Sequence, residues 1–121
     1  MKIYVSGPIN GRVEGNLAAF CVAQGEITEL GHTAVIPHNC PPHEHVGECP
    51  QGYATPFAAD YPEHTSTACF IRGDFEELLT CDAIYMLPGW ERSVGARGEF
   101  DVAALAGLEI YYQDAPGVPR A

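Results

Sequence analysis

The feature that most constrains this chain is the alternation of short apolar segments with longer segments of helical periodicity. Four short segments predict strands, and the first three run into glycine or proline: residues 2–6, 33–36, 82–87 and 108–112. Apolar residues at helical spacing predict helices between them, over about 17–30, 67–80 and 94–106, with Asn16, Ser66 or Thr67, and Ser93 as N-caps. This order predicts parallel strands joined by right-handed helical crossovers.

We therefore expect a three-layer α/β fold of the flavodoxin or Rossmann type. Its small parallel sheet has four to five strands in the order 2-1-3-4, with helices on both faces. A length of 121 residues suits a single domain, and we expect it to span 1–121. A loop at about 38–64 interrupts the alternation, because it holds five of the ten prolines and four of the five histidines without a period. Residues 114–121 have the composition of a tail.

Net charge and cysteine content indicate which binding partners and which cellular compartment suit this chain. Six basic and sixteen acidic residues give a net charge of −10, which disfavours a nucleic acid partner but allows one small phosphorylated ligand held by backbone N–H groups. No apolar run approaches the ~20 residues of a membrane span, so we expect no membrane partner. Five cysteines without a secretion signal indicate reduced thiols and a cytoplasmic protein, with Cys21, Cys69 and Cys81 in the core.

Two carboxylates stand where the helical pattern predicts apolar contact. Parallel sheets bind ligands beyond the carboxyl ends of their strands, where segments 6–12, 37–38 and 88–95 are expected to meet. Glu99 is centred on the small apolar face of its helix, within about 60° of Ala96 and Ala103 on a helical wheel. Asp74 lies at the edge of an apolar stripe on the preceding helix. Glu99 is thus a candidate nucleophile and Asp74 its partner, although a rim position or a salt bridge explains either residue alone.

Weaker candidates surround this pair. The loop from Ser6 to Arg12 has the glycines and donors to wrap an anion, or is a plain loop. Ser93 is a helix cap whose hydroxyl can also meet a phosphate. Trp90 is a candidate to stack on the base of a ligand, or it packs against other side chains of the protein. The His and Cys residues from His38 to Cys69 are possible zinc ligands, but their spacing matches no standard zinc site. We expect neither a metal nor another cofactor, because the two carboxylates can supply the chemistry.

Five segments together resemble a known superfamily. They are Tyr4-Val5-Ser6-Gly7-Pro8-Ile9-Asn10-Gly11, Gly31-His32, Asp74 with Leu78 and Cys81-Asp82, Leu87-Pro88-Gly89-Trp90-Glu91, and Ser93-x-Gly95-Ala96-x-x-Glu99. The pattern resembles a small branch of the nucleoside 2-deoxyribosyltransferase-like superfamily, related to nucleoside 5′-monophosphate N-glycosidases. Two positions depart from it: Asp101 replaces a small residue, and Gly73 stands where the hydrolases have arginine.

The resemblance implies roles for individual residues. Glu99 matches the nucleophile that attacks C1′. Asp74 matches the carboxylate that contacts or protonates the leaving base, and Tyr4 matches an aromatic residue near the nucleophile. Ser93 matches the serine of the hydrolases rather than the aspartate of the transferases, which favours a 5′-phosphate. The residues expected to bind substrate are Ser6, Gly7, Ile9, Asn10, Gly11, Arg12, His38, Trp90, Ser93 and Gly95.

The expected function is therefore cleavage or transfer at the N-glycosidic bond of a (deoxy)nucleoside or its 5′-monophosphate, through a Glu99 glycosyl-enzyme. The resemblance also implies a homodimer or higher homo-oligomer. Two alternatives remain open at this point: a nucleotide-binding protein without catalysis, acting as a sensor or sponge in the same pocket, and a small interaction module without a ligand.

Overall fold

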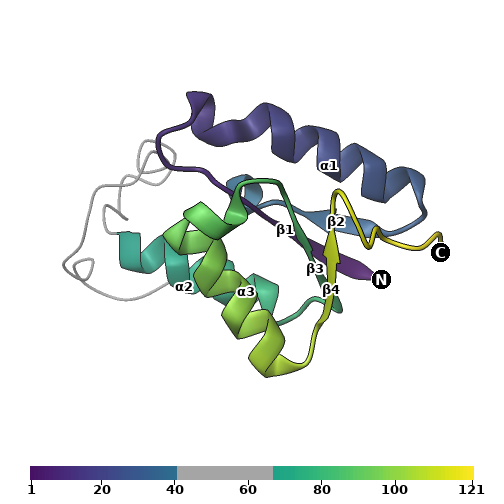
Figure 1. The fold of residues 1–121 in the computed structure, drawn as a ribbon. Coiled ribbons are helices and arrows are strands. Elements are labelled where there is room, and N and C mark those ends of the chain that lie inside the picture. Colours follow the sequence, from purple (N-terminus) through teal and green to yellow (C-terminus); the bar gives the residue numbers. More distant parts are fainter. Residues whose placement is uncertain (41–66) are drawn as a thin grey trace.

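A four-stranded parallel sheet forms the centre of the molecule. The computed structural model describes residues 1–40 and 67–121. Its strands are β1 (Lys2–Ser6), β2 (Thr33–Val35), β3 (Ala83–Met86) and β4 (Glu109–Tyr112), in the order β2-β1-β3-β4. Helix α1 (Leu17–Glu29) covers one face, and α2 (Thr67–Leu78) and α3 (Val94–Ala106) cover the other (Figure 1). The predicted fold class and strand order are confirmed.

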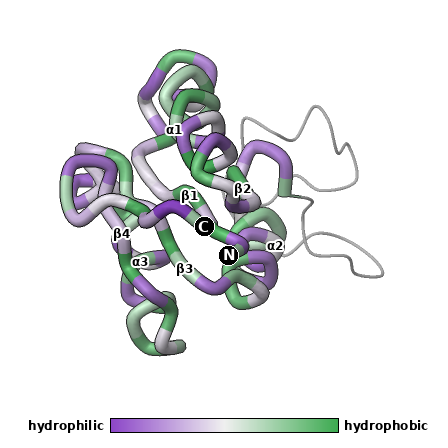
Figure 2. The backbone as a smooth tube through the Cα atoms, turned by 90° about the vertical axis from the view of Figure 1, so that its right-hand side faces the viewer, coloured by the Kyte–Doolittle hydropathy of each residue, from purple (hydrophilic) through white to green (hydrophobic). Residues whose placement is uncertain are grey.

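Strands β1 and β3 supply both hydrophobic cores, because successive strand residues point to opposite faces. Ile3 and Val5 pack on the α1 side, whereas Tyr4 packs on the side of α2 and α3. The register sets Tyr4 beside Ile84 and Ser6 beside Met86. Figure 2 shows the hydrophobic colour running along these central strands.

Three short 3-10 helices were not predicted: η1 (Val13–Asn16), η2 (Pro37–Asn39) and η3 (Trp90–Arg92). The first corrects the predicted cap of α1. Asn16 precedes the helix in the left-handed region, at φ 63°, and makes no side-chain cap bond. Its Nδ2 instead donates to the Pro8 carbonyl oxygen at 2.9 Å, which holds the segment after β1 against the start of α1.

The C-terminal residues pack on the fold rather than hanging free as a tail. The Ala121 backbone N–H donates to the Leu30 carbonyl oxygen at 2.8 Å, and Nε2 of His32 donates to the Pro119 carbonyl oxygen at 2.6 Å. Cys69 and Cys81 are buried as expected, but Cys21 is exposed on α1, so that expectation was wrong. Among the described helices, none has the length and apolar content to cross a membrane.

Candidate active site

Glu99 is a buried carboxylate on the sheet-facing side of α3. Ser93 starts this helix, and its Oγ accepts a hydrogen bond from the Ala96 backbone N–H at 3.2 Å. Ala96 and Ala103 pack closely against the sheet, and Glu99 between them is only 7% exposed. The burial predicted from the helical pattern is confirmed. A carboxylate buried to this degree requires hydrogen-bond partners.

Two hydroxyl groups of β1 supply those partners. The Tyr4 hydroxyl donates to Oε2 of Glu99, and the Ser6 hydroxyl donates to Oε1 at 2.8 Å. Both donors are fully buried, and they stand two residues apart on the strand, so they point to the same face. Each carboxylate oxygen has a second lone pair that these bonds do not use. Glu99 is therefore oriented at both oxygens by hydroxyl groups of β1.

Asp74 on α2 forms the second half of the pair. Burial raises the pKa of Asp74 to about 8, and the negative charge of Glu99 adds to the rise. Burial also raises the pKa of Glu99 to about 7, against the opposing effect of the hydrogen bonds from Tyr4 and Ser6. At neutral pH, Asp74 is mostly protonated and Glu99 is partly ionised. This division suits an acid beside a nucleophile.

Tyr4 remains a proton donor in this environment. Burial, followed by the negative charges of Glu99 and Asp74, raises its pKa well above the ordinary value. Within residues 1–40 and 67–121, the one ion pair within 4.0 Å joins Lys2 to Glu77 at 2.8 Å, so no described basic side chain neutralises either carboxylate.

Cys40 lies in the same electrostatic environment, and sequence analysis considered it only as a metal ligand. Its thiol is buried and donates to the Ile36 carbonyl oxygen at 3.5 Å. Burial, then the negative charges of Asp74 and other carboxylates, raise its pKa well above the ordinary value, so the thiol stays protonated. Its position just after the second strand, at the carboxyl edge of the sheet, was the available signal.

The segments predicted to meet at this edge lie together in the structure, since η2 with His38 also packs against β1. The Leu87 backbone N–H donates to the Ser6 carbonyl oxygen at 2.8 Å, which joins the segments that follow β1 and β3. Gly7 is required at this contact, because a Cβ there would lie 2.8 Å from Cβ of Leu87. Of the other candidates in this loop, Ile9 packs into the α1-side core, whereas Asn10, Gly11 and Arg12 are exposed.

His38 and Trp90 have protein partners in the structure. Nε2 of His38 donates to the Gly15 carbonyl oxygen at 2.7 Å, and its ring meets Phe20 edge-on at 4.7 Å. Burial lowers the pKa of His38, which favours the neutral ring. The Trp90 ring stacks on Phe100 at 4.6 Å between centroids. Substrate contacts by His38, Trp90 and the exposed Gly95 remain predictions.

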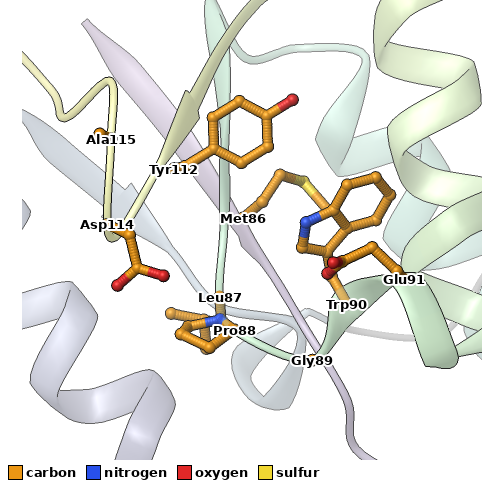
Figure 3. A pocket seen from close by; sticks show the side chains of 9 residues that line it. All are labelled: Met86, Leu87, Pro88, Gly89, Trp90, Glu91, Tyr112, Asp114 and Ala115. Atoms are coloured by element: carbon orange, nitrogen blue, oxygen red, sulfur yellow. The ribbon is translucent and has the colours of Figure 1, made fainter.

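A hollow of about 370 Å³ lies at the carboxyl edge of β3 and β4. Figure 3 shows the rings of Trp90 and Tyr112 and the carboxylates of Glu91 and Asp114 around it. Glu99, Asp74 and Tyr4 are not among the residues that line it. The hollow is therefore separate from the hydrogen-bonded centre around Glu99.

The candidate zinc ligands lie partly within and partly outside the described residues. In the described parts of the chain, no three His, Cys, Asp or Glu side chains form a group that could hold a metal ion. His43, His45, Cys49 and His64 lie outside the described residues.

Comparison with known proteins gives one family match. The model of a family described as a domain of unknown function, DUF4406, matches residues 1–112. No curated protein matches the chain.

Solved structures share the fold at low identity. A 2-deoxyribosyltransferase from the psychrotolerant bacterium Bacillus psychrosaccharolyticus is 18% identical, with a TM-score of 0.59 over 93% of this chain and 71% of its own. A 2-desoxiribosyltransferase from Leishmania mexicana is 16% identical, with a TM-score of 0.60 over 92% of this chain. A conserved protein from Enterococcus faecalis V583 is 21% identical, with a TM-score of 0.59 over 93% of this chain. The chain spans 62% of the length of each of the last two. These matches confirm the predicted resemblance at the level of the fold.

Proposed function

The chain belongs to the DUF4406 family, and we propose that it is an enzyme that cleaves or transfers the N-glycosidic bond of a nucleoside or nucleoside 5′-monophosphate. The observation that carries this proposal is the hydrogen bonding of Glu99. A carboxylate that is 7% exposed accepts one hydroxyl at each oxygen, from Tyr4 and Ser6, and its negative charge contributes to the raised pKa of Asp74. Paired carboxylates with different protonation states are suited to glycosidic chemistry. The shared fold with 2-deoxyribosyltransferases supports the same class of substrate.

The proposed reaction has two steps. First, an ionised Glu99 oxygen attacks C1′ of the sugar, and the bond from C1′ to the base nitrogen breaks. The electron pair leaves with the base, which takes the proton of Asp74. Second, a water molecule or another base attacks C1′, the Glu99 ester bond breaks, and Asp74 accepts the proton of the incoming group. Tyr4 and Ser6 orient Glu99 throughout, so the chain's own side chains supply each proton transfer.

Base release, followed by chromatography, tests the proposal. Wild-type protein is incubated with a panel of nucleoside 5′-monophosphates and free nucleosides, alone and with a second base as acceptor. Glu99→Ala and Asp74→Asn are measured alongside, with Glu29→Gln as a control at an exposed carboxylate on the far end of α1. We expect release by wild type and Glu29→Gln, with losses of about 10³-fold or more for Glu99→Ala. Absence of release from every substrate, with thermal stabilisation by one of them, would instead support a nucleotide-binding protein without catalysis.

The same proposal includes a homodimer and a cytoplasmic location. Val94 and Leu105 are 77% and 91% exposed, and their spacing of eleven residues puts them on one side of α3. A second subunit on this side would cover both side chains, and light scattering of the purified protein tests whether it is a dimer.

The four described cysteines are all free, which supports the proposed location in a reducing compartment.

A further inference from the structure

Two arginines from separate segments converge beyond the carboxyl ends of β1 and β3. Arg12 follows the loop after β1, and Arg92 ends η3. Their Nη2 atoms lie 3.4 Å and 3.5 Å from the point that a Cβ on Gly89 would occupy, so the two guanidinium groups are neighbours. Gly89 adopts a φ of 90°, which glycine tolerates, and its missing side chain leaves room for both groups.

This convergence is electrostatically unfavourable without an anion. The chain has sixteen acidic and six basic residues, so carboxylate partners are abundant on its surface. Yet the ion pairs within the described residues include neither Arg12 nor Arg92, since the pair found joins Lys2 to Glu77. Two adjacent guanidinium groups with no described carboxylate within 4.0 Å form a fork for an oxyanion. Phosphate is one of the oxyanions that arginine binds in two-point contacts.

The arginine pair is also connected to the reaction centre through the backbone. Ser6 donates its hydroxyl to Glu99 and accepts the Leu87 backbone N–H at its carbonyl oxygen, so it joins the centre to both arginine-bearing segments. A sugar whose C1′ faces Glu99 would direct its 5′ substituent away from that carboxylate. A 5′-phosphate also needs a local positive field, because the net charge of −10 repels it elsewhere on the surface.

We propose that Arg12 and Arg92 bind the 5′-phosphate of the substrate, and that Arg92 makes the protein selective for nucleoside 5′-monophosphates over free nucleosides. This inference rests on the proposed function for the identity of the substrate. It adds a residue, Arg92, that sequence analysis did not identify. It also gives Arg12 a partner from a different segment.

The test compares charge variants in activity and in binding. Arg92→Gln and Arg12→Gln each remove one cation of the pair, and Arg92→Lys keeps the charge without the fork. Arg120→Gln removes the same charge near the C-terminus, where the Arg120 side chain contacts the Glu29 carbonyl. The first readout is kcat/KM for a nucleoside 5′-monophosphate divided by kcat/KM for the matching free nucleoside. The second is the Kd of ribose 5-phosphate by calorimetry, which requires no catalysis. Circular dichroism confirms that each variant is folded.

We expect each Gln variant of the pair to lower the selectivity ratio and weaken ribose 5-phosphate binding by about tenfold, the size of one charge-assisted hydrogen bond at an exposed site. Arg92→Lys should recover part of the loss, and Arg120→Gln should match wild type. If base is released but the ratio does not change in Arg92→Gln, the inference is wrong and the proposed function stands. If no base is released but ribose 5-phosphate binding depends on Arg92, the inference stands and the proposed function is wrong. Failure of wild type to bind ribose 5-phosphate would overturn the inference directly.

Discussion

Replacing Glu99 by glutamine tests the electrostatics of the candidate site through stability rather than activity. Glutamine has nearly the same shape as glutamate, so Glu99→Gln removes a charge and leaves the volume of the buried side chain. The remaining amide oxygen still accepts the hydrogen bond from Ser6, whereas the new NH2 group faces the Tyr4 hydroxyl. The hydrogen-bond energy lost there is roughly the same at every pH. That constant cost cancels when the two proteins are compared across pH.

The expected magnitude follows from the pKa of Glu99. Folding raises it from the ordinary 4.5 to about 7, chiefly through burial. Because the folded pKa is the higher one, the stabilisation from the protonated form is complete below about pH 4.5 and is lost as pH rises through about 7. At 1.36 kcal/mol per pH unit, this difference amounts to about 3 kcal/mol. Removing the charge of Glu99 also lowers the pKa of Asp74, which adds to the change in the same direction.

Urea unfolding of both proteins at pH 5, 6, 7, 8 and 9 measures this difference. We expect the free energy of unfolding of Glu99→Gln, relative to wild type, to increase by about 3 kcal/mol between pH 5 and pH 9. Most of the increase should fall below pH 8. Glu29→Gln, at an exposed position, should show no such trend. A flat difference across this range, or one that falls with pH, would refute the conclusion that burial dominates the ionisation of Glu99.

Three further predictions follow from the same geometry. The rate of base release should be highest between about pH 7 and 8, because Glu99 must be ionised and Asp74 protonated; a rate that stays level to pH 10 would contradict this assignment. Tyr4→Phe should lower kcat and move the acid limb of the pH profile to higher pH, since the Tyr4 hydrogen bond lowers the pKa of Glu99; an unmoved limb would argue against that bond. Trp90→Ala should lower the free energy of unfolding by about 2–3 kcal/mol in urea titrations through lost stacking on Phe100, and a change below about 0.5 kcal/mol would show that the contact is unimportant.

Local patterns in the sequence were sufficient for the architecture. The alternation of strands and helices fixes a parallel sheet, because short connections and right-handed crossovers leave few topologies. The bounds of β1 match the predicted residues, and α3 matches the predicted range of about 94–106. The burial of Glu99 was equally predictable, since the helical period places it between Ala96 and Ala103 on the face that meets the sheet. These features depend on residues close in sequence, where backbone geometry fixes relative position.

Other features required the tertiary structure, because they join residues far apart in the chain. The family resemblance put Tyr4 near Glu99, but no local period indicates that the hydroxyls of Tyr4 and Ser6 each donate to one oxygen of that carboxylate, more than ninety positions away. Likewise, Asn16 had the residue type of a helix cap, but the nearby Pro8 carbonyl competed for its side chain. Arg92 was inconspicuous until the left-handed turn at Gly89 brought it beside Arg12. The sequence determined the sheet and the helix face on which the candidate nucleophile Glu99 lies. The hydrogen-bond partners of Glu99 and the pairing of Arg12 with Arg92 depended on how separate segments pack. Polar contacts between distant segments are set by distances in three dimensions and not by the periodicity of the sequence.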